Sequence, residues 1–208
     1  MSFFPDGPFA DCATYGQAYF DLIREAQAGV SGAALSEAAV LLASAVRNSA
    51  TIFACGNGGS AAIANHLLCD YLKGISTGTT INPRVISLSS ATELITAIAN
   101  DIGVEEIFAY PLRSLGRKDD VLIAISSSGQ SPNIVKAIEA AQALQMRVIA
   151  LTGFSGGRAS ELADVSIHVD ADNYGVVEDV HQSVMHILAQ YLKQAHYINP
   201  KALGSVPF

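Results

Sequence analysis

The sequence is poor in cysteine and in long apolar runs, and both shortages exclude classes of protein. Its 208 residues include three cysteines, an odd number without a Cys-x-x-Cys motif, which favours a reduced, cytoplasmic compartment over a secreted disulfide scaffold. No stretch reaches the roughly 18 consecutive apolar residues of a membrane-spanning helix, and the first residues carry no basic signal segment. We therefore expect a cytoplasmic protein that is neither secreted nor embedded in a membrane.

Basic residues are also scarce. Twelve Lys and Arg stand against nineteen Asp and Glu, which gives a formal net charge of -7. A negative field of this kind repels a phosphate backbone, so a nucleic-acid partner is disfavoured. Any anionic ligand must then be held by local dipoles rather than by the overall charge.

The composition that remains is that of a well-packed protein. Half of the residues are hydrophobic and 15% are charged, which permits a substantial core and excludes disorder for most of the chain. The length predicts a single domain spanning 1–208. Within it we expect N-terminal helices over about 13–48, an α/β core over about 51–196 and an irregular tail over 197–208.

Short apolar runs alternate with helical segments in the core region. Runs without alternation between polar and apolar residues suit strands that are covered on both faces, and the intervening helices suit parallel crossovers. We therefore predict a three-layer αβα sandwich with a five-stranded parallel sheet. Two helices precede the sheet, the second beginning near Ser36. A helix over 61–73 follows the first strand, and a long helix over about 176–195 closes the core. The five predicted strands are 51–55, 84–88, 121–125, 148–151 and 165–169.

Two of these strands end in turns rich in glycine or serine, CGNGGS at 55–60 and ISSSGQS at 125–131. Glycines let the backbone approach a ligand closely, and the free N–H groups of a helix start attract an anion. The first turn fits neither a Walker A loop nor a Rossmann fingerprint. A plainer alternative is a tight turn at the first and an ordinary helix start, with Ser131 as N-cap before Pro132, at the second. Because parallel strands open at one edge, we expect the two loops to form a single phosphate cradle.

His66 and Asp70 lie four residues apart on the helix that follows the first loop, so their side chains share a face. An imidazole and a carboxylate placed in this way can chelate a divalent metal or act as an acid–base pair. A hydrogen bond on the helix surface is the alternative for such a pair.

The last helix carries Glu178, Gln182 and His186 at successive four-residue steps. Glu178 and His186 are separated by about 12 Å along the axis at a rise of 1.5 Å per residue, which is far for a single site. His181 lies on a neighbouring face, and we expect it to be a packed or surface histidine.

In this order, the motifs resemble the sugar isomerase (SIS) family, and specifically its phosphoheptose isomerase branch. The resemblance rests on the two loops together with AND at 99–101 and LTG at 151–153, and it extends to about residue 195. It implies a SIS fold, a phosphorylated sugar as substrate and a homotetramer with active sites between subunits. The substrate-binding residues that we expect are Asn57, Gly58, Gly59, Ser60, Asp70, Asn100, Asp101, Ser126, Ser127, Ser128, Ser131 and Glu178.

The same resemblance implies a metal and a catalytic set. The branch uses His, Glu, Gln and His, which fall on His66, Asp70, Glu178 and His186, with zinc as the expected cofactor. Asp70 is then the base and His186 the acid. Two of the four residues depart from the pattern, because Asp70 is one methylene shorter than Glu and Glu178 carries a charge that Gln lacks.

The activity implied is the isomerisation of sedoheptulose 7-phosphate to D-glycero-D-manno-heptose 7-phosphate through an enediol, at the start of a route to lipopolysaccharide or other surface glycans. Two alternatives stay open. The changes at Asp70 and Glu178 permit an isomerase for another phosphosugar. A non-catalytic SIS protein that binds a sugar phosphate as a regulatory signal is the other, although keeping two histidines and two carboxylates argues against it.

Overall fold

Five parallel strands form one sheet in the order β2-β1-β3-β4-β5. This is a computed structural model, and it describes residues 4–206 and 208. All five predicted strands are confirmed, with ends that differ by no more than one residue. Their bounds are β1 Thr51–Gly56, β2 Arg84–Ser87, β3 Val121–Ser126, β4 Arg147–Thr152 and β5 Val165–His168.

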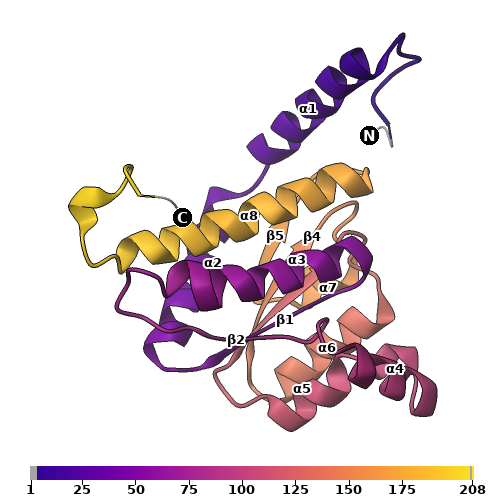
Figure 1. Cartoon of the computed structure of the whole chain (residues 1–208). Helices are drawn as coiled ribbons and strands as arrows, with labels where there is room; N and C mark the ends of the chain where they lie inside the picture. Colours follow the sequence, from indigo (N-terminus) through magenta and orange to yellow (C-terminus); the bar gives the residue numbers. More distant parts are fainter. Residues whose placement is uncertain (1–3, 207) are drawn as a thin grey trace.

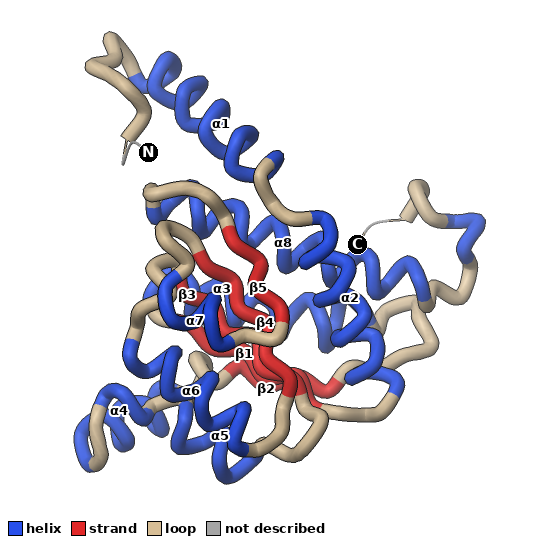
Figure 2. Tube along the Cα trace, turned by 180° about the vertical axis from the view of Figure 1, so that it is seen from behind, coloured by secondary structure: helices blue, strands red, loops and turns tan. Residues whose placement is uncertain are grey.

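Helices cover both faces of the sheet, which confirms the three-layer sandwich (Figure 2). Successive strand residues point to opposite faces: Ile52 packs in one core, under α2, α3 and α8, and Phe53 packs in the other, under α4 to α7. The strands therefore read as unbroken apolar runs. The α-helices are α1 Cys12–Ala28, α2 Gly32–Arg47, α3 Gly58–Cys69, α4 Thr92–Asp101, α5 Ala109–Leu115, α6 Pro132–Ala143, α7 Gly157–Leu162 and α8 Tyr174–Ala195.

Helix α1 extends away from the sandwich as an arm (Figure 1). It packs on α8, where the Tyr19 hydroxyl donates to an Asp179 carboxylate oxygen at 2.8 Å. Across the described part of the chain, no single helix is long and apolar enough to cross a membrane. Helices α1 and α2 pass that test only as a pair, and the pair is bent by 70°.

Two helix boundaries differ from prediction. The second helix begins at Gly32 rather than near Ser36, because the Ser31 side chain accepts a hydrogen bond from the Ala34 N–H and caps it there. The helix predicted over 61–73 is α3 followed by a π-helix, η1, at Asp70–Ile75. Two 3₁₀ turns complete the described elements, η2 at Val104–Glu106 and η3 at Pro200–Ala202.

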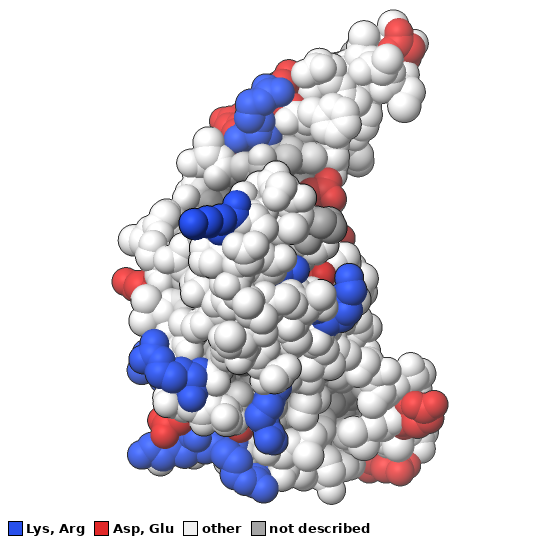
Figure 3. All heavy atoms as spheres, turned by 60° about the vertical axis from the view of Figure 1, so that its left-hand side comes forward, with Lys and Arg blue, Asp and Glu red and all other residues white. Residues whose placement is uncertain are grey.

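Charged side chains are sparse on the surface. On the face shown in Figure 3, most Lys and Arg gather toward the end of the molecule away from α1, and broad uncharged areas cover much of the rest. An anion would therefore depend on the backbone and hydroxyl dipoles of its own site. The order of the sheet supplies such a place, because β2 lies on one side of β1 and β3 on the other. Ligands gather at such a switch point in the strand order.

Candidate functional site

The loops after β1 and β3 meet at the switch point around a small polar hollow, here called the serine hollow. Its volume of about 130 Å³ is below the roughly 300–1,000 Å³ of drug-sized pockets, so it fits one small group. Hydroxyls dominate its walls, and Ser126 and Ser127 are buried. The lining residues are Asn57, Ser60, Ile125, Ser126, Ser127, Ser128, Ser131, Tyr174 and Glu178.

The loop after β3, residues 127–131, is here called the serine loop, and backbone hydrogen bonds from the loop after β4 and from α7 hold it in place. The Gly153 N–H donates to the Ser127 carbonyl at 2.8 Å, and the Ala159 N–H donates to the Gly129 carbonyl at 2.9 Å. Gly129 has a φ of +64°, and a Cβ there would collide with the Gly156 carbonyl. The Ser127 hydroxyl is buried and has no hydrogen-bond partner among the described residues. The loop therefore presents a fixed, unused hydroxyl at the hollow.

A second polar group lies further along α3 and α8. His66 Nε2 is 3.3 Å from Asp70 Oδ1, and His186 Nε2 is 3.6 Å from Asp70 Oδ2 and 3.3 Å from His66 Nε2. One ligand atom from each of the three residues lies within 4.8 Å of the others. We call this the His–Asp–His group.

This group fits a divalent metal. Asp70 is 8% exposed, and its Oδ2 has no hydrogen-bond partner within the described ranges. The two oxygens of this carboxylate face one imidazole nitrogen each, Oδ1 toward His66 and Oδ2 toward His186, and such electron-pair donors are the ligands that a divalent cation requires. Two histidines and one carboxylate also match the three-ligand set of catalytic zinc sites.

Helix geometry brings the group together. Asp70 is the C-cap residue of α3 and the first residue of the π-helix, in which Tyr71 is fully buried. The carboxylate is therefore held at the point where the helix changes from α to π winding. Gln182 Nε2 lies 2.9 Å from His186 Nε2. The sequence analysis predicts that Gln182 shares a helix face with His186 but does not predict this contact. Their spacing of four residues is the feature from which the contact could have been predicted.

Glu178, the fourth residue of the predicted metal set, lies apart from the His–Asp–His group. Its carboxylate packs against Gly59 at the start of α3, where a Cβ would collide with it, and it lines the serine hollow. Burial, with a smaller effect of the Asp179 charge, raises the pKa of Glu178. The residue therefore faces the predicted phosphate position rather than the two histidines.

Asn100 and Asp101, predicted to bind substrate, lie at the exposed end of α4. Their side chains bond to each other, from Asn100 Nδ2 to Asp101 Oδ1 at 2.7 Å. Neither lines the serine hollow. The segment that follows reaches a neighbouring hollow through Gly103, Val104 and Glu105, which share it with Asn57.

His181 is fully buried, as the packed alternative for this residue predicts. Its Nε2 lies 3.1 Å from the Thr152 carbonyl oxygen, and burial lowers the pKa of the ring to about 4. His181 therefore stays neutral and belongs to the core.

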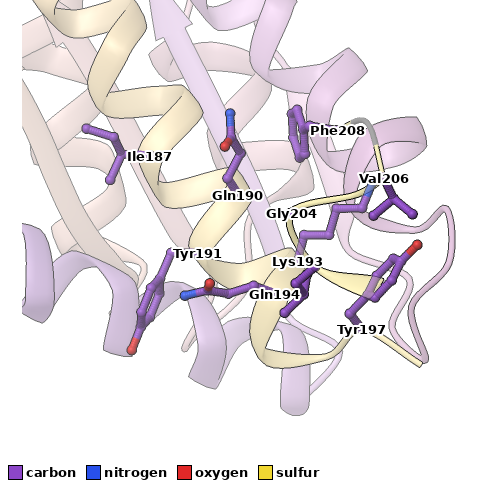
Figure 4. Close-up of a pocket in the computed structure, with 10 residues that line it drawn as sticks. Ile187, Gln190, Tyr191, Lys193, Gln194, Tyr197, Gly204, Val206 and Phe208 are labelled. Carbon is purple, nitrogen blue, oxygen red and sulfur yellow. The ribbon is translucent and has the colours of Figure 1, made fainter. Parts of the chain in front are cut away.

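A larger hollow of about 530 Å³ lies at the far end of α8. Figure 4 shows that side chains of α8 and of the C-terminal segment line it, among them Tyr191, Lys193 and Tyr197. It holds none of the predicted site residues. Predicted binding residues therefore line the smaller, polar serine hollow and not this larger one.

Comparisons with known proteins show what this chain is similar to. Residues 14–153 match the SIS domain family. A phosphoheptose isomerase of Bordetella avium is 42% identical over 157 residues, covering 74% of this chain and 79% of that protein. One from Desulfovibrio desulfuricans is 33% identical over 182 residues, covering 88% and 86%. The solved structure of a phosphoheptose isomerase from Francisella tularensis superimposes with a TM-score of 0.81 at 32% identity, covering 88% of this chain and 96% of that one.

Proposed function

We propose, from the premise that this chain belongs to the SIS domain family and to its phosphoheptose isomerase branch, that it interconverts sedoheptulose 7-phosphate and D-glycero-D-manno-heptose 7-phosphate. The observation that carries the proposal is the placement of a buried carboxylate, Asp70, between two histidines on the same two helices that wall the serine hollow. A phosphate anchor and a proton-transfer group then stand at two ends of one site.

The spacing suits an extended phosphosugar. Ser60 in the serine hollow and His66 in the His–Asp–His group are six residues apart on α3, or about 9 Å along the axis. An open-chain heptose phosphate has a similar length. Its phosphate would sit on the hydroxyls of Ser126, Ser127, Ser128 and Ser131 and on the N–H groups at the starts of α3 and α6.

Proton transfer falls to Asp70 and His186. Asp70 takes the proton from C1 of the ketose and returns it to C2, while His186 protonates the C2 oxygen and accepts the proton of the C1 hydroxyl. The enediol lies between these two steps, and the overall change is neutral in atoms and charge. Gln182 bonds to His186 and would orient its ring.

A divalent metal is proposed at His66, Asp70 and His186, with zinc as the expected ion. When bound, it supplies positive charge beside the carbonyl, which acidifies the neighbouring C–H. A carboxylate that ligates a metal is a weaker base, but Asp70 has a second oxygen that can accept the proton. A His186 that ligates a metal through Nε2 cannot donate a proton from that nitrogen, so metal ligation and acid catalysis are alternative roles for His186 Nε2. Glu178 is assigned to the substrate side because its carboxylate faces the serine hollow.

Assembly and location are further proposals. The branch implies a homotetramer with active sites between subunits, in which the exposed Asn100 and Asp101 of one copy would reach the site of another. The cytoplasmic location stays a prediction from the sequence.

The test is turnover of sedoheptulose 7-phosphate by the purified protein, before chelation, after chelation and with zinc restored. We expect Asp70→Asn and His186→Gln each to lower kcat by about 10²- to 10⁴-fold, the usual effect of losing a general acid or base. Asp21→Asn, a change in an exposed carboxylate paired with Arg24 on α1, is the matched control and should leave kcat unchanged. Absence of turnover, with the sugar phosphate still binding in calorimetry, would favour another phosphosugar or a sensor.

A further inference from the structure

One pair of amide side chains joins the loop after β1 to the loop after β3. Asn57 Nδ2 donates to Asn133 Oδ1 at 2.9 Å, and Asn133 Nδ2 donates to Asn57 Oδ1 at 2.8 Å. If either amide turned over alone, oxygen would face oxygen and nitrogen would face nitrogen, and both bonds would be lost. The pair therefore fixes the orientation of each amide against the other.

This pairing changes what Asn57 does at the start of α3. Asn57 is the N-cap residue, with an extended backbone, yet its side chain makes no capping hydrogen bond. An asparagine at this position ordinarily accepts a bond from an N–H two or three residues on. Because the amide is committed to Asn133, it does not cover the first N–H groups of α3.

The start of α3, whose first N–H groups have no side-chain cap, faces a hollow with other features of an anion-binding site. The serine hollow contains the buried, unpartnered hydroxyl of Ser127. The N-cap of α6, Ser131, likewise makes no side-chain capping bond. Two helix starts, each free of a side-chain cap, therefore meet at one hollow, and this arrangement attracts a phosphate.

Asn133 does not itself reach that phosphate position. It is 6% exposed and is absent from the walls of the serine hollow, whereas Asn57 lines it. Both amides line the adjoining hollow beside Gly103 and Glu105. Any effect of Asn133 on the serine hollow must therefore pass through Asn57.

We propose that Asn133 is a positioning residue of the phosphate site. By holding the Asn57 amide in the wall between the two hollows, it keeps that side chain from capping α3 and leaves the N–H groups of the helix for a phosphate monoester. This inference rests on the proposed function. It adds to that function an explanation of why the Asn57 side chain does not occupy the phosphate site.

The test uses inorganic phosphate as the probe, so that it does not depend on turnover. Its Kd is measured by calorimetry on the full chain for Asn133→Ala, Asn57→Ala and the double variant. We expect Asn133→Ala to raise the Kd about tenfold, because the released Asn57 amide then caps α3. In the Asn57→Ala background no such cap can form, and the same change should alter the Kd less than twofold.

A matched control lies on the same helix. Gln142 donates from its amide to the Leu162 carbonyl at 2.8 Å, far along α6 from the loops, so Gln142→Ala should leave the Kd unchanged. Asn133→Ser is the second variant, with a smaller cavity, should Asn133→Ala fail to fold. With a turned-over substrate, Asn133→Ala should raise KM while kcat changes little.

An equal change of Kd in both backgrounds would overturn the inference, because Asn133 would then act without Asn57. This failure is distinct from a failure of the proposed function. An unaltered protein that binds phosphate and does not turn over sedoheptulose 7-phosphate would refute the reaction and leave the amide pair as the device that opens a phosphate site.

Discussion

Glu178 places a carboxylate in the hollow that is proposed to hold a phosphate. A carboxylate and a phosphate about 4 Å apart repel each other by on the order of 1 kcal/mol when solvent screens both charges. We therefore expect Glu178→Gln to lower the Kd for inorganic phosphate about fivefold at pH 8. Because burial raises the pKa of Glu178, its charge is lost at a higher pH than for an ordinary carboxyl. The difference in Kd between the variant and the unaltered protein should therefore shrink as the pH is lowered.

Calorimetric titration with phosphate at several pH values measures this effect, with zinc content determined alongside. Glu161→Gln, which removes an exposed carboxylate paired with Arg158 on α7, is the control. If the variant bound phosphate as before but lost zinc, Glu178 would be a metal ligand. This outcome would contradict its assignment as a residue that faces the substrate.

His181 makes a separate, pH-dependent contribution to stability. Burial lowers its pKa to about 4, whereas the ring in an unfolded chain titrates near 6.5. Between these two values the unfolded chain binds more protons, so the free energy of unfolding falls as the pH is lowered from about 6.5 to 4, by on the order of 3 kcal/mol in total.

Urea unfolding at steps from pH 7 to pH 4 checks this expectation. His181→Gln keeps an amide that can donate to the Thr152 carbonyl but removes the titrating ring, so its stability should fall less over this range. His196→Gln, at the end of α8, should follow the unaltered protein. If the free energy of unfolding fell equally with pH in the unaltered protein and in His181→Gln, the buried ring would not be the cause of the loss of stability in acid.

At the scale of single residues, local spacing predicted part of the site. The four-residue step from His66 to Asp70 is a property of any helix, so their shared face could be predicted. The position of Glu178 could not, because spacing along α8 leaves open whether its side chain turns toward His186 or toward Gly59. Asn133 left no local signal, since its partner lies 76 positions away in the sequence.

At the scale of elements, the serine loop depends on close backbone packing at Gly129. A side chain there would meet the Gly156 carbonyl at a φ of +64°, so Gly129→Ala combines steric collision with left-handed strain. We expect a loss of about 2–4 kcal/mol in the free energy of unfolding and at least tenfold weaker phosphate binding.

Gly16→Ala is the matched control for that change. Gly16 lies within α1, and a Cβ there has nothing within 4 Å, so alanine should be neutral or should stabilise the protein by up to about 1 kcal/mol. Chemical denaturation of both variants gives the comparison. If Gly129→Ala were as stable as Gly16→Ala and bound phosphate normally, the loop would not require its tight contact with the loop after β4.

The strands were the most predictable elements, because a parallel sheet covered on both faces needs short unbroken apolar runs such as 121–125. Helix ends were less predictable. The change from α3 to a π-helix at Asp70 coincides with the burial of Tyr71, Gly74 and Ile75. Burial of that kind depends on tertiary packing, which no local pattern of the sequence reveals.

At the scale of the whole molecule, apolar side chains are exposed on the arm and on the helices beside it. Phe20 of α1, Val40 of α2, and Ile187 and Tyr191 of α8 are 61%, 68%, 51% and 55% exposed. Leu35, Val40, Ile187 and Tyr191 also line or border a groove of about 480 Å³ between α2 and α8. Apolar surface gathered in this way is typical of an interface, which fits the proposed homotetramer.

Ile187→Glu tests this assembly, because a charge placed in a buried interface without a partner costs several kcal/mol. We expect light scattering with size exclusion to give four times the 21.7 kDa chain mass for the unaltered protein and a smaller species for the variant. Leu115→Glu, which charges an apolar residue of similar exposure, 49%, at the end of α5, should keep the full mass. If the unaltered protein were a monomer that still turned over substrate, Asn100 and Asp101 would have no role in a neighbouring site, and a site shared between subunits would be excluded.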